Sequence, residues 1–188
     1  MHKLSTLDIV VIAIVLIILP LPFFFFGSKV VTTTNLRYLV KAEVPLRLSI
    51  PSIGVDTDII KVGLTSAGAM DTPKGPKEVA WYELGPKPGE NGASVIAGHS
   101  SWSNNIPAAF DNLPKLKVGE KVYVKDVEGK TTTFVVKSSR LFDPKADAGI
   151  VFNSTSGKHL NLITCAGVWD EATKSSSKRL VVFTDLVE

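Results

Sequence analysis

The chain has 188 residues, a length that fits one domain of ordinary size with a substantial hydrophobic core. Its 21 basic and 18 acidic residues give a net charge of +3, and it has no dense run of Lys and Arg. We therefore do not expect the protein to bind nucleic acid. The only cysteine, Cys165, can form no intramolecular disulfide, so the stability of the domain must come from packing. A lone thiol also cannot by itself hold a metal that needs four ligands.

The first feature along the chain is an uncharged, apolar run over residues 9–26. Eighteen helical residues span about 27 Å, close to the hydrocarbon thickness of a bilayer. The run is longer than the apolar part of a signal peptide and ends without a small-residue cleavage site, so it predicts an uncleaved transmembrane anchor within residues 1–28. Because a short basic segment precedes the run, we expect a single-pass protein of the cell membrane whose remaining residues are extracellular.

Residues 29–44 are Thr-rich and weakly patterned, and we interpret them as a stalk or linker. The domain is expected over residues 45–188, where short β-type runs alternate with Gly and Pro. These runs are residues 46–50, 55–62, 79–82, 94–98, 121–127, 131–142, 160–164 and 180–186. The best candidate for a short helix is residues 106–113, with Pro107 in the first turn. The pattern predicts an all-β barrel or sandwich, and a closed barrel is preferred because closure removes exposed edges.

Three side chains with complementary chemistry lie at strand ends. His99 and Cys165 each follow a predicted strand, and Arg179 opens the last one. A cysteine thiolate is a nucleophile, an imidazole can accept and return a proton, and a guanidinium can stabilise the oxygen of a tetrahedral intermediate. If these strand ends meet at one rim of a barrel, the trio suffices for acyl transfer through a thioester.

Each of these residues also has an ordinary interpretation when taken alone. Cys165 can be a small buried side chain, His99 a loop histidine, and Arg179 a solvated charge at a strand end. His159 is a second candidate for the base, but it precedes its strand instead of following it. The sequence therefore favours the catalytic interpretation only through the combination of the three residues.

The segment around the cysteine carries a specific resemblance. Residues 161–165 (Asn-Leu-Ile-Thr-Cys) resemble the Thr-Leu-x-Thr-Cys signature of sortases, the membrane-anchored cysteine transpeptidases of Gram-positive-type bacteria, with Asn161 in place of the usual Thr. Residues 97–99 (Ala-Gly-His) match the context of the catalytic histidine of the family, and Arg179 matches its arginine. Residues 68–71, 79–82 and 95–99 are most similar to class F, followed by classes D and E.

The resemblance implies an eight-stranded sortase barrel with one or two short helices. Cys165, His99 and Arg179 would be catalytic, and Thr164 and Ala97 would bind substrate. The substrates would be secreted proteins with a carboxy-terminal signal similar to Leu-Pro-x-Thr-Gly. They would be cleaved between Thr and Gly and transferred to an amine of a peptidoglycan precursor or a pilin lysine, with no cofactor.

Three alternatives remain open at the level of the sequence. A related cysteine peptidase would transfer the acyl group to water, because it needs the same thiol and imidazole. A surface module that kept the barrel but lost the chemistry would have an inert Cys165. A structural wall protein would carry the three residues by chance. No carboxylate cluster that would favour calcium is visible, since Glu78, Glu83 and Glu90 are scattered.

Overall fold

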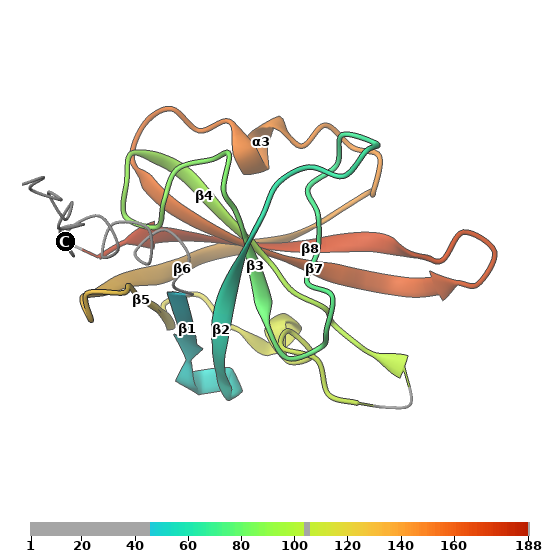
Figure 1. Ribbon diagram of the computed structural model, residues 1–188, viewed down its shortest axis with the longest axis horizontal. Coiled ribbons are helices and arrows are strands. Elements are labelled where there is room, and N and C mark those ends of the chain that lie inside the picture. Colours follow the sequence, from blue (N-terminus) through green and yellow to red (C-terminus); the bar gives the residue numbers. More distant parts are fainter. Residues whose placement is uncertain (1–45, 104–105, 188) are drawn as a thin grey trace, which may run out of the picture. The chain divides into compact units, whose positions relative to one another are not determined.

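The computed structural model describes residues 46–103 and 106–187, and these residues form an eight-stranded closed barrel (Figure 1). The strand order around the barrel is β1-β2-β3-β4-β7-β8-β6-β5. The strands are β1 (Leu46–Ile50), β2 (Val55–Val62), β3 (Val79–Tyr82), β4 (Gly92–Ala97), β5 (Lys121–Lys125), β6 (Thr131–Phe142), β7 (Lys158–Asp170) and β8 (Ser175–Leu186). The helical elements are η1 (Pro51–Ile53), η3 (Leu113–Lys115) and α3 (Gly149–Phe152). The predicted all-β barrel is thus confirmed.

The transmembrane anchor expected in residues 1–28 and the stalk expected in residues 29–44 lie outside the described residues. Within residues 46–103 and 106–187, no helix is both long enough and apolar enough to cross a membrane.

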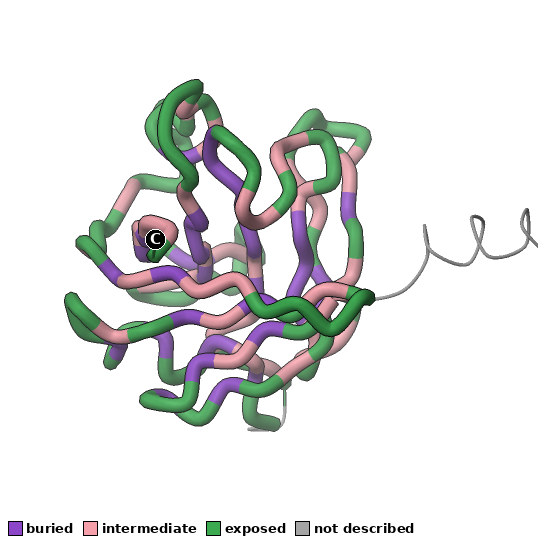
Figure 2. The backbone as a smooth tube through the Cα atoms, turned by 90° about the vertical axis from the view of Figure 1, so that its left-hand side faces the viewer, coloured by how far each residue is buried: buried purple, intermediate pink, exposed green. Residues whose placement is uncertain are grey.

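The barrel interior is filled by alternate residues of the strands, because successive side chains of a strand point to opposite faces. Figure 2 shows this alternation as buried positions interspersed with more exposed ones along the chain. In this core the largest fully buried side chains are Phe110, Phe134, Leu48, Ile50, Ile59, Ile96, Leu113, Leu160, Leu162, Val79 and Val122. Phe110 and Leu113 come from the segment between β4 and β5 and pack into this same core.

A second, smaller apolar cluster lies on the outer face of the barrel. It is centred on Val95 of β4, Val151 of α3 and Val181 of β8, all of which are buried. The segment 143–157, which joins β6 to β7 and contains α3, covers the sheet here. We call this segment the β6–β7 loop. Its packing explains why residues on the outer face of β7, such as Asn161, are buried as well.

The helix predicted for residues 106–113 is wrong. The backbone N–H of Ala109 donates to the carbonyl of Pro76 (2.8 Å), and that of Phe110 donates to the carbonyl of His99 (2.9 Å). These amides are therefore used to join distant segments and cannot close the turns of an α-helix. Among residues 106–115, all of which the structure describes, the helical turn is η3, which begins at Leu113.

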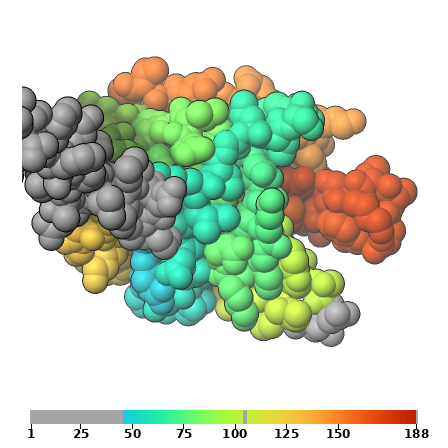
Figure 3. Space-filling model, viewed as in Figure 1, coloured from blue at the N-terminus to red at the C-terminus, as the bar shows by residue number. Residues whose placement is uncertain are grey.

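The strands β7 and β8 extend further than the sequence predicts. The predicted strands end at residue 164 and begin again at residue 180, whereas β7 continues to Asp170 and β8 begins at Ser175. The two strands form a hairpin that projects from the barrel (Figures 1 and 3). Residues 171–174 form its turn, in which Lys174 has a positive φ of 50°.

Gly98, which follows β4, lies in close contact with the core. A Cβ atom at this position would lie 2.7 Å from the Phe110 ring and 3.0 Å from Cγ1 of Val79. Phe110 is 0% exposed, so its ring has no free space into which it could move. Only glycine fits at this strand end without displacing the core.

We expect Gly98→Ala to lower the free energy of unfolding of the full-length protein by about 1–3 kcal/mol, the usual cost of overpacking a core. Denaturant titration in detergent measures this change. Gly63→Ala is the matched control, because a Cβ atom there would meet only a Glu83 carboxylate oxygen at 3.9 Å. Equal unfolding midpoints for the two variants would contradict the prediction.

Candidate active site

Cys165 lies on β7 at the point where this strand leaves the barrel, and it is half-buried. The antiparallel register of β7 and β8 pairs Cys165 with Arg179. Directly opposite residues on two such strands point to the same face, with Cβ atoms about 4.5–5.5 Å apart. The thiol and the guanidinium therefore project from neighbouring positions of one surface.

His99 is brought to the same place by the parallel pairing of β4 with β7. Ala97 pairs with Ile163, and the N–H of Gly98 donates to the Ile163 carbonyl at 3.0 Å. Because the two strands are parallel and in this register, the residues that follow Ala97 lie beside those that follow Ile163. The end of β4 thus carries His99 to the middle of β7, where Cys165 lies and where this strand leaves the barrel.

The imidazole of His99 is oriented by two contacts. Its Nε2 atom lies 2.7 Å from the carbonyl oxygen of Pro73, and its ring packs edge-on against Trp102 with centroids 4.8 Å apart. Because a carbonyl oxygen only accepts hydrogen bonds, Nε2 carries the hydrogen. In the neutral ring, this leaves Nδ1 as the atom that can accept a proton.

A cleft of about 670 Å³ is lined by all three residues of the predicted trio, His99, Cys165 and Arg179. Ala97 and Thr164, the two predicted substrate-binding residues, line it too. The structure therefore brings together the five residues that the sequence singles out, and their chemical roles stay predictions. His159 does not line this cleft: it lies six positions before Cys165 on β7, about 20 Å away at the rise of an extended strand.

Thr164 has a structural contact of its own. Its hydroxyl group is buried and donates to the carbonyl of Gly98 at 2.7 Å. This bond joins the residue before His99 to the residue before Cys165. It fixes the two strand ends relative to each other.

The guanidinium of Arg179 is held by its own strand. Nη1 donates to the carbonyls of Ser176 (2.9 Å) and Lys178 (3.0 Å), and Nη2 donates to Oγ of Ser175 (3.0 Å). An arginine has five N–H donors, so these bonds leave the Nε–H and one Nη2–H for an acceptor in the cleft. The group is thus positioned by β8 and keeps the capacity to bind an oxygen atom of a substrate.

The β7–β8 hairpin adds residues that the sequence analysis missed. Trp169, Glu171 and Lys174 line the same cleft. Glu171 forms an ion pair with Lys174 and accepts a hydrogen bond from the Trp169 indole N–H at 3.0 Å. These bonds, the one from Lys174 first, lower the pKa of Glu171, which is therefore a carboxylate at neutral pH. In the sequence, Trp169, four positions after Cys165, is the feature that could have indicated that this segment contributes to the site.

A second cavity, of about 210 Å³, adjoins the cleft and shares Thr72, Ala97, Ile163 and Arg179 with it. The remaining wall comes largely from the β6–β7 loop, including Val151 and Phe152. Its mainly apolar lining suits an apolar side chain of a bound chain. Among residues 46–103 and 106–187, no group of three or more His, Cys, Asp or Glu side chains is arranged to hold a metal ion.

Comparisons with known proteins agree with this geometry. A family model described as "Sortase domain" matches residues 48–187. Among similar solved structures, a lid mutant of sortase A from Corynebacterium diphtheriae is 26% identical, with a TM-score of 0.59, 77% of this chain covered and 70% of that one. Sortase C-1 from Actinomyces oris is 26% identical, with a TM-score of 0.62 and coverages of 76% and 73%.

A sortase D5 from Clostridium perfringens shares the fold, with 21% identity, a TM-score of 0.60 and coverages of 82% and 88%. No protein with a curated description matches the chain. The matched structures named here are described as sortases A, C and D, so the resemblance to class F is not confirmed.

Thr164→Val is expected to lower the free energy of unfolding by about 1–3 kcal/mol, because it leaves the buried Gly98 carbonyl without its donor. It should also change the rate at which an alkylating reagent modifies Cys165, since the two strand ends are no longer joined. Thr164→Ser is the control that keeps the hydroxyl group. If the serine variant loses as much stability as the valine variant, the hydrogen bond is not the cause.

Proposed function

Because the chain belongs to the sortase family of cysteine transpeptidases, we propose that it cleaves a signal similar to Leu-Pro-x-Thr-Gly between Thr and Gly and transfers the acyl group to an amine. The observation that carries this proposal is the single cleft lined by His99, Cys165 and Arg179. A thiol, an imidazole and a guanidinium at one site are the groups that acyl transfer requires.

The first half of the reaction forms a thioester. The thiolate of Cys165 attacks the carbonyl carbon of the signal threonine, and a C–S bond forms as the C–N bond to glycine breaks. The imidazolium of His99 gives its proton to the departing glycine amine. Nδ1 is the atom placed for this transfer, because Nε2 is bound to the Pro73 carbonyl.

The second half returns the enzyme to its starting state. The neutral His99 takes a proton from the incoming amine, which attacks the thioester carbonyl. A new C–N bond forms, the C–S bond breaks, and the thiolate of Cys165 is released with no cofactor consumed. During both halves, the free N–H groups of Arg179 stabilise the negative oxygen of the tetrahedral intermediate. Its position opposite Cys165 on β8 supports this role.

The cavity beside the cleft suits the apolar part of the signal. Its walls include Ile163 and Val151, and it shares Ala97, Ile163 and Arg179 with the catalytic cleft. We place the leucine or proline side chain of the signal there, with the Thr–Gly bond at Cys165. Ala97, which lines both cavities, would contact the peptide between these two points.

The partners and location of the enzyme follow from the same proposal. The anchor expected in residues 1–28 would hold the domain at the outer surface of the cell membrane. Its substrates there would be secreted proteins, and the amine would come from a peptidoglycan precursor or a pilin lysine. The similarity of residues 68–71 and 79–82 to class F favours that class.

We expect the full-length protein in detergent to exchange the Thr–Gly amide of a Leu-Pro-x-Thr-Gly peptide for an amide to an added triglycine, as followed by mass spectrometry. Cys165→Ala should abolish the exchange. Arg179→Ala should slow it about 10²–10³-fold, the usual effect of removing one donor to an oxyanion. Arg47→Ala is the matched control, since Arg47 is exposed and bound to Asp56 and Asp58 outside the cleft.

Two results would contradict the proposal. Cleavage without amine transfer would indicate a peptidase that uses water. No reaction at all, with a Cys165 thiol no more reactive than free cysteine, would indicate another signal sequence or an inert module. A normal exchange rate for Arg179→Ala would contradict the role proposed for Arg179 and leave the proposed reaction intact.

A further inference from the structure

The β6–β7 loop forms one wall of the proposed peptide cavity, so its position determines the shape of that cavity. We propose that His159 and Asp185 form a latch that fixes the far end of this loop, and that the latch holds only while the imidazole is doubly protonated. The effect on peptide binding rests on the proposed function, whereas the latch itself does not.

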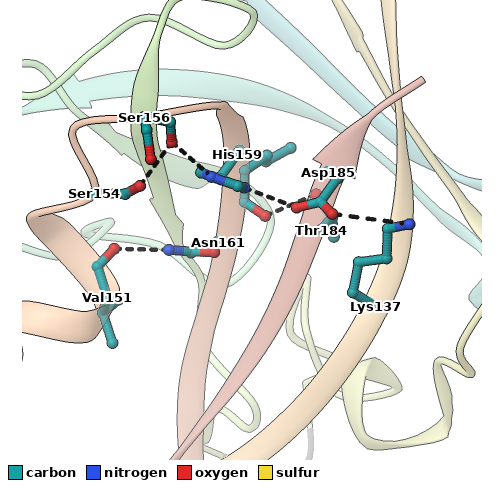
Figure 4. A network of polar contacts seen from close by, with 9 residues as sticks. Lys137, Val151, Ser154, Ser156, His159, Asn161, Thr184 and Asp185 are labelled. Carbon is teal, nitrogen blue, oxygen red and sulfur yellow. Dashed lines mark hydrogen bonds and ion pairs between the residues drawn. The ribbon is translucent and has the colours of Figure 1, made fainter. Parts of the chain in front are cut away.

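The latch consists of one histidine between two oxygen atoms (Figure 4). Nδ1 of His159 lies 2.7 Å from a carboxylate oxygen of Asp185 on β8. Nε2 lies 2.9 Å from the carbonyl oxygen of Ser156, near the end of the loop. That carbonyl also accepts a hydrogen bond from the hydroxyl of Ser154 at 2.9 Å. The ring therefore joins the loop to the barrel.

The protonation state follows from the partners. A carbonyl oxygen and a carboxylate only accept hydrogen bonds, and a neutral imidazole has a single N–H. Both bonds can exist together only when His159 carries two ring protons and a positive charge. Loss of one proton therefore breaks one of the two contacts, and the loop end is no longer joined to Asp185 through the ring.

The surrounding charges come from two neighbouring strands. Asp185 on β8 favours the charged ring. Lys137 on β6 opposes the positive charge of the ring through its own contact with Asp185 at 3.8 Å. Arg140 on β6 carries a further positive charge and lines a cavity of about 260 Å³ that His159 and Asp185 also line. The side of this cavity formed by the loop and by β4 contributes Ile150, Ser154 and Ala93, none of which is charged. The direct carboxylate contact makes Asp185 the main partner.

The backbone around the latch is closely fitted. Gly157 has φ +73°, and a Cβ atom there would lie 2.7 Å from Nε2 of His159. Its carbonyl accepts the N–H of Gly92 on β4 at 2.7 Å. Gly92 has φ +109°, and a Cβ atom there would lie 3.0 Å from the Ser154 carbonyl oxygen. The loop end thus rests directly on the ring and on β4, where no side chain could fit.

The latch is connected to the peptide cavity through α3. Asn161, two positions after His159 on the same face of β7, donates from Nδ2 to the carbonyl of Val151 at 2.7 Å. Val151 lines the peptide cavity. Movement of the loop end would therefore shift this wall. His159 itself is about 20 Å from Cys165 along β7, so it is a positioning residue and takes no part in the chemistry.

Hydrogen exchange of the full-length protein in detergent, followed by mass spectrometry, tests the latch without any substrate. With intrinsic exchange rates corrected for pH, residues 143–157 of the wild type should lose protection as the pH rises from about 5 to about 8, the range in which histidine changes charge. In His159→Gln the protection of these residues should be reduced at every pH and should no longer change with pH, because the bonds from Gly92 and Asn161 to the loop remain. Lys158→Gln, which removes a charge at the adjacent position, should behave as the wild type.

A second variant addresses the charge directly. Asp185→Asn replaces the carboxylate by an amide whose Nδ2–H can donate to an unprotonated Nδ1 while Nε2–H still donates to the Ser156 carbonyl, so protection of the loop should no longer fall as the pH rises. This variant also keeps the proposal testable if His159→Gln fails to fold. Protection of the loop that does not depend on pH in the wild type, or that is unchanged in the folded variants, would overturn the proposal.

The peptide assay gives an independent readout. His159→Gln should raise KM for the peptide about tenfold, equivalent to the loss of one hydrogen bond to a charged group, with little change in kcat. A fall in kcat with unchanged KM would contradict a positioning role. If the wild type shows no turnover of the peptide, the proposed function fails, whereas the hydrogen-exchange result still decides on the latch.

Discussion

The parallel pairing of β4 with β7 is the constraint on which the site depends. It places the carboxyl end of β4 beside Ile163 in the middle of β7, which brings His99 close to Cys165 although 66 positions separate them. The hydrogen bond from Thr164 to the Gly98 carbonyl fixes the two ends at the residue before each functional side chain. The antiparallel pairing of β7 with β8 then adds Arg179 at the position opposite Cys165. The cleft is therefore a consequence of strand register.

Much of this arrangement could be predicted from local patterns. Period-two alternation in residues 46–50 and turn residues such as Gly129 mark strands and hairpins because they reflect short-range geometry. The trio could be predicted because strand ends of a small barrel converge at its rims. The helix at residues 106–113 could not be assigned correctly, since the amides of Ala109 and Phe110 bond to segments far away in sequence. A local pattern contains no information about such partners.

The β7–β8 hairpin and the contacts of His159 were not predicted, for a different reason. Trp169 is 51% exposed, and residues 167–170 of the hairpin are all exposed, so no alternation of buried and exposed positions marks this part of β7 in the sequence. His159 was judged only as a competing base, because its partners Asp185 and Ser156 come from other elements. The sequence could not predict the role of His159, because both partners of its ring nitrogens lie on other segments of the chain.

The outer face of β7 has a consequence for how the family fold can vary. His159, Asn161, Ile163 and Cys165 occupy alternate positions of one strand, so they share a face only while an odd number of residues separates each pair. Insertion of a single residue between His159 and Cys165 would turn one of them into the barrel core if the strand stayed regular. The strand between the loop attachment and the nucleophile can therefore change length by two residues, or by one residue that a β-bulge takes up, without turning either side chain to the other face.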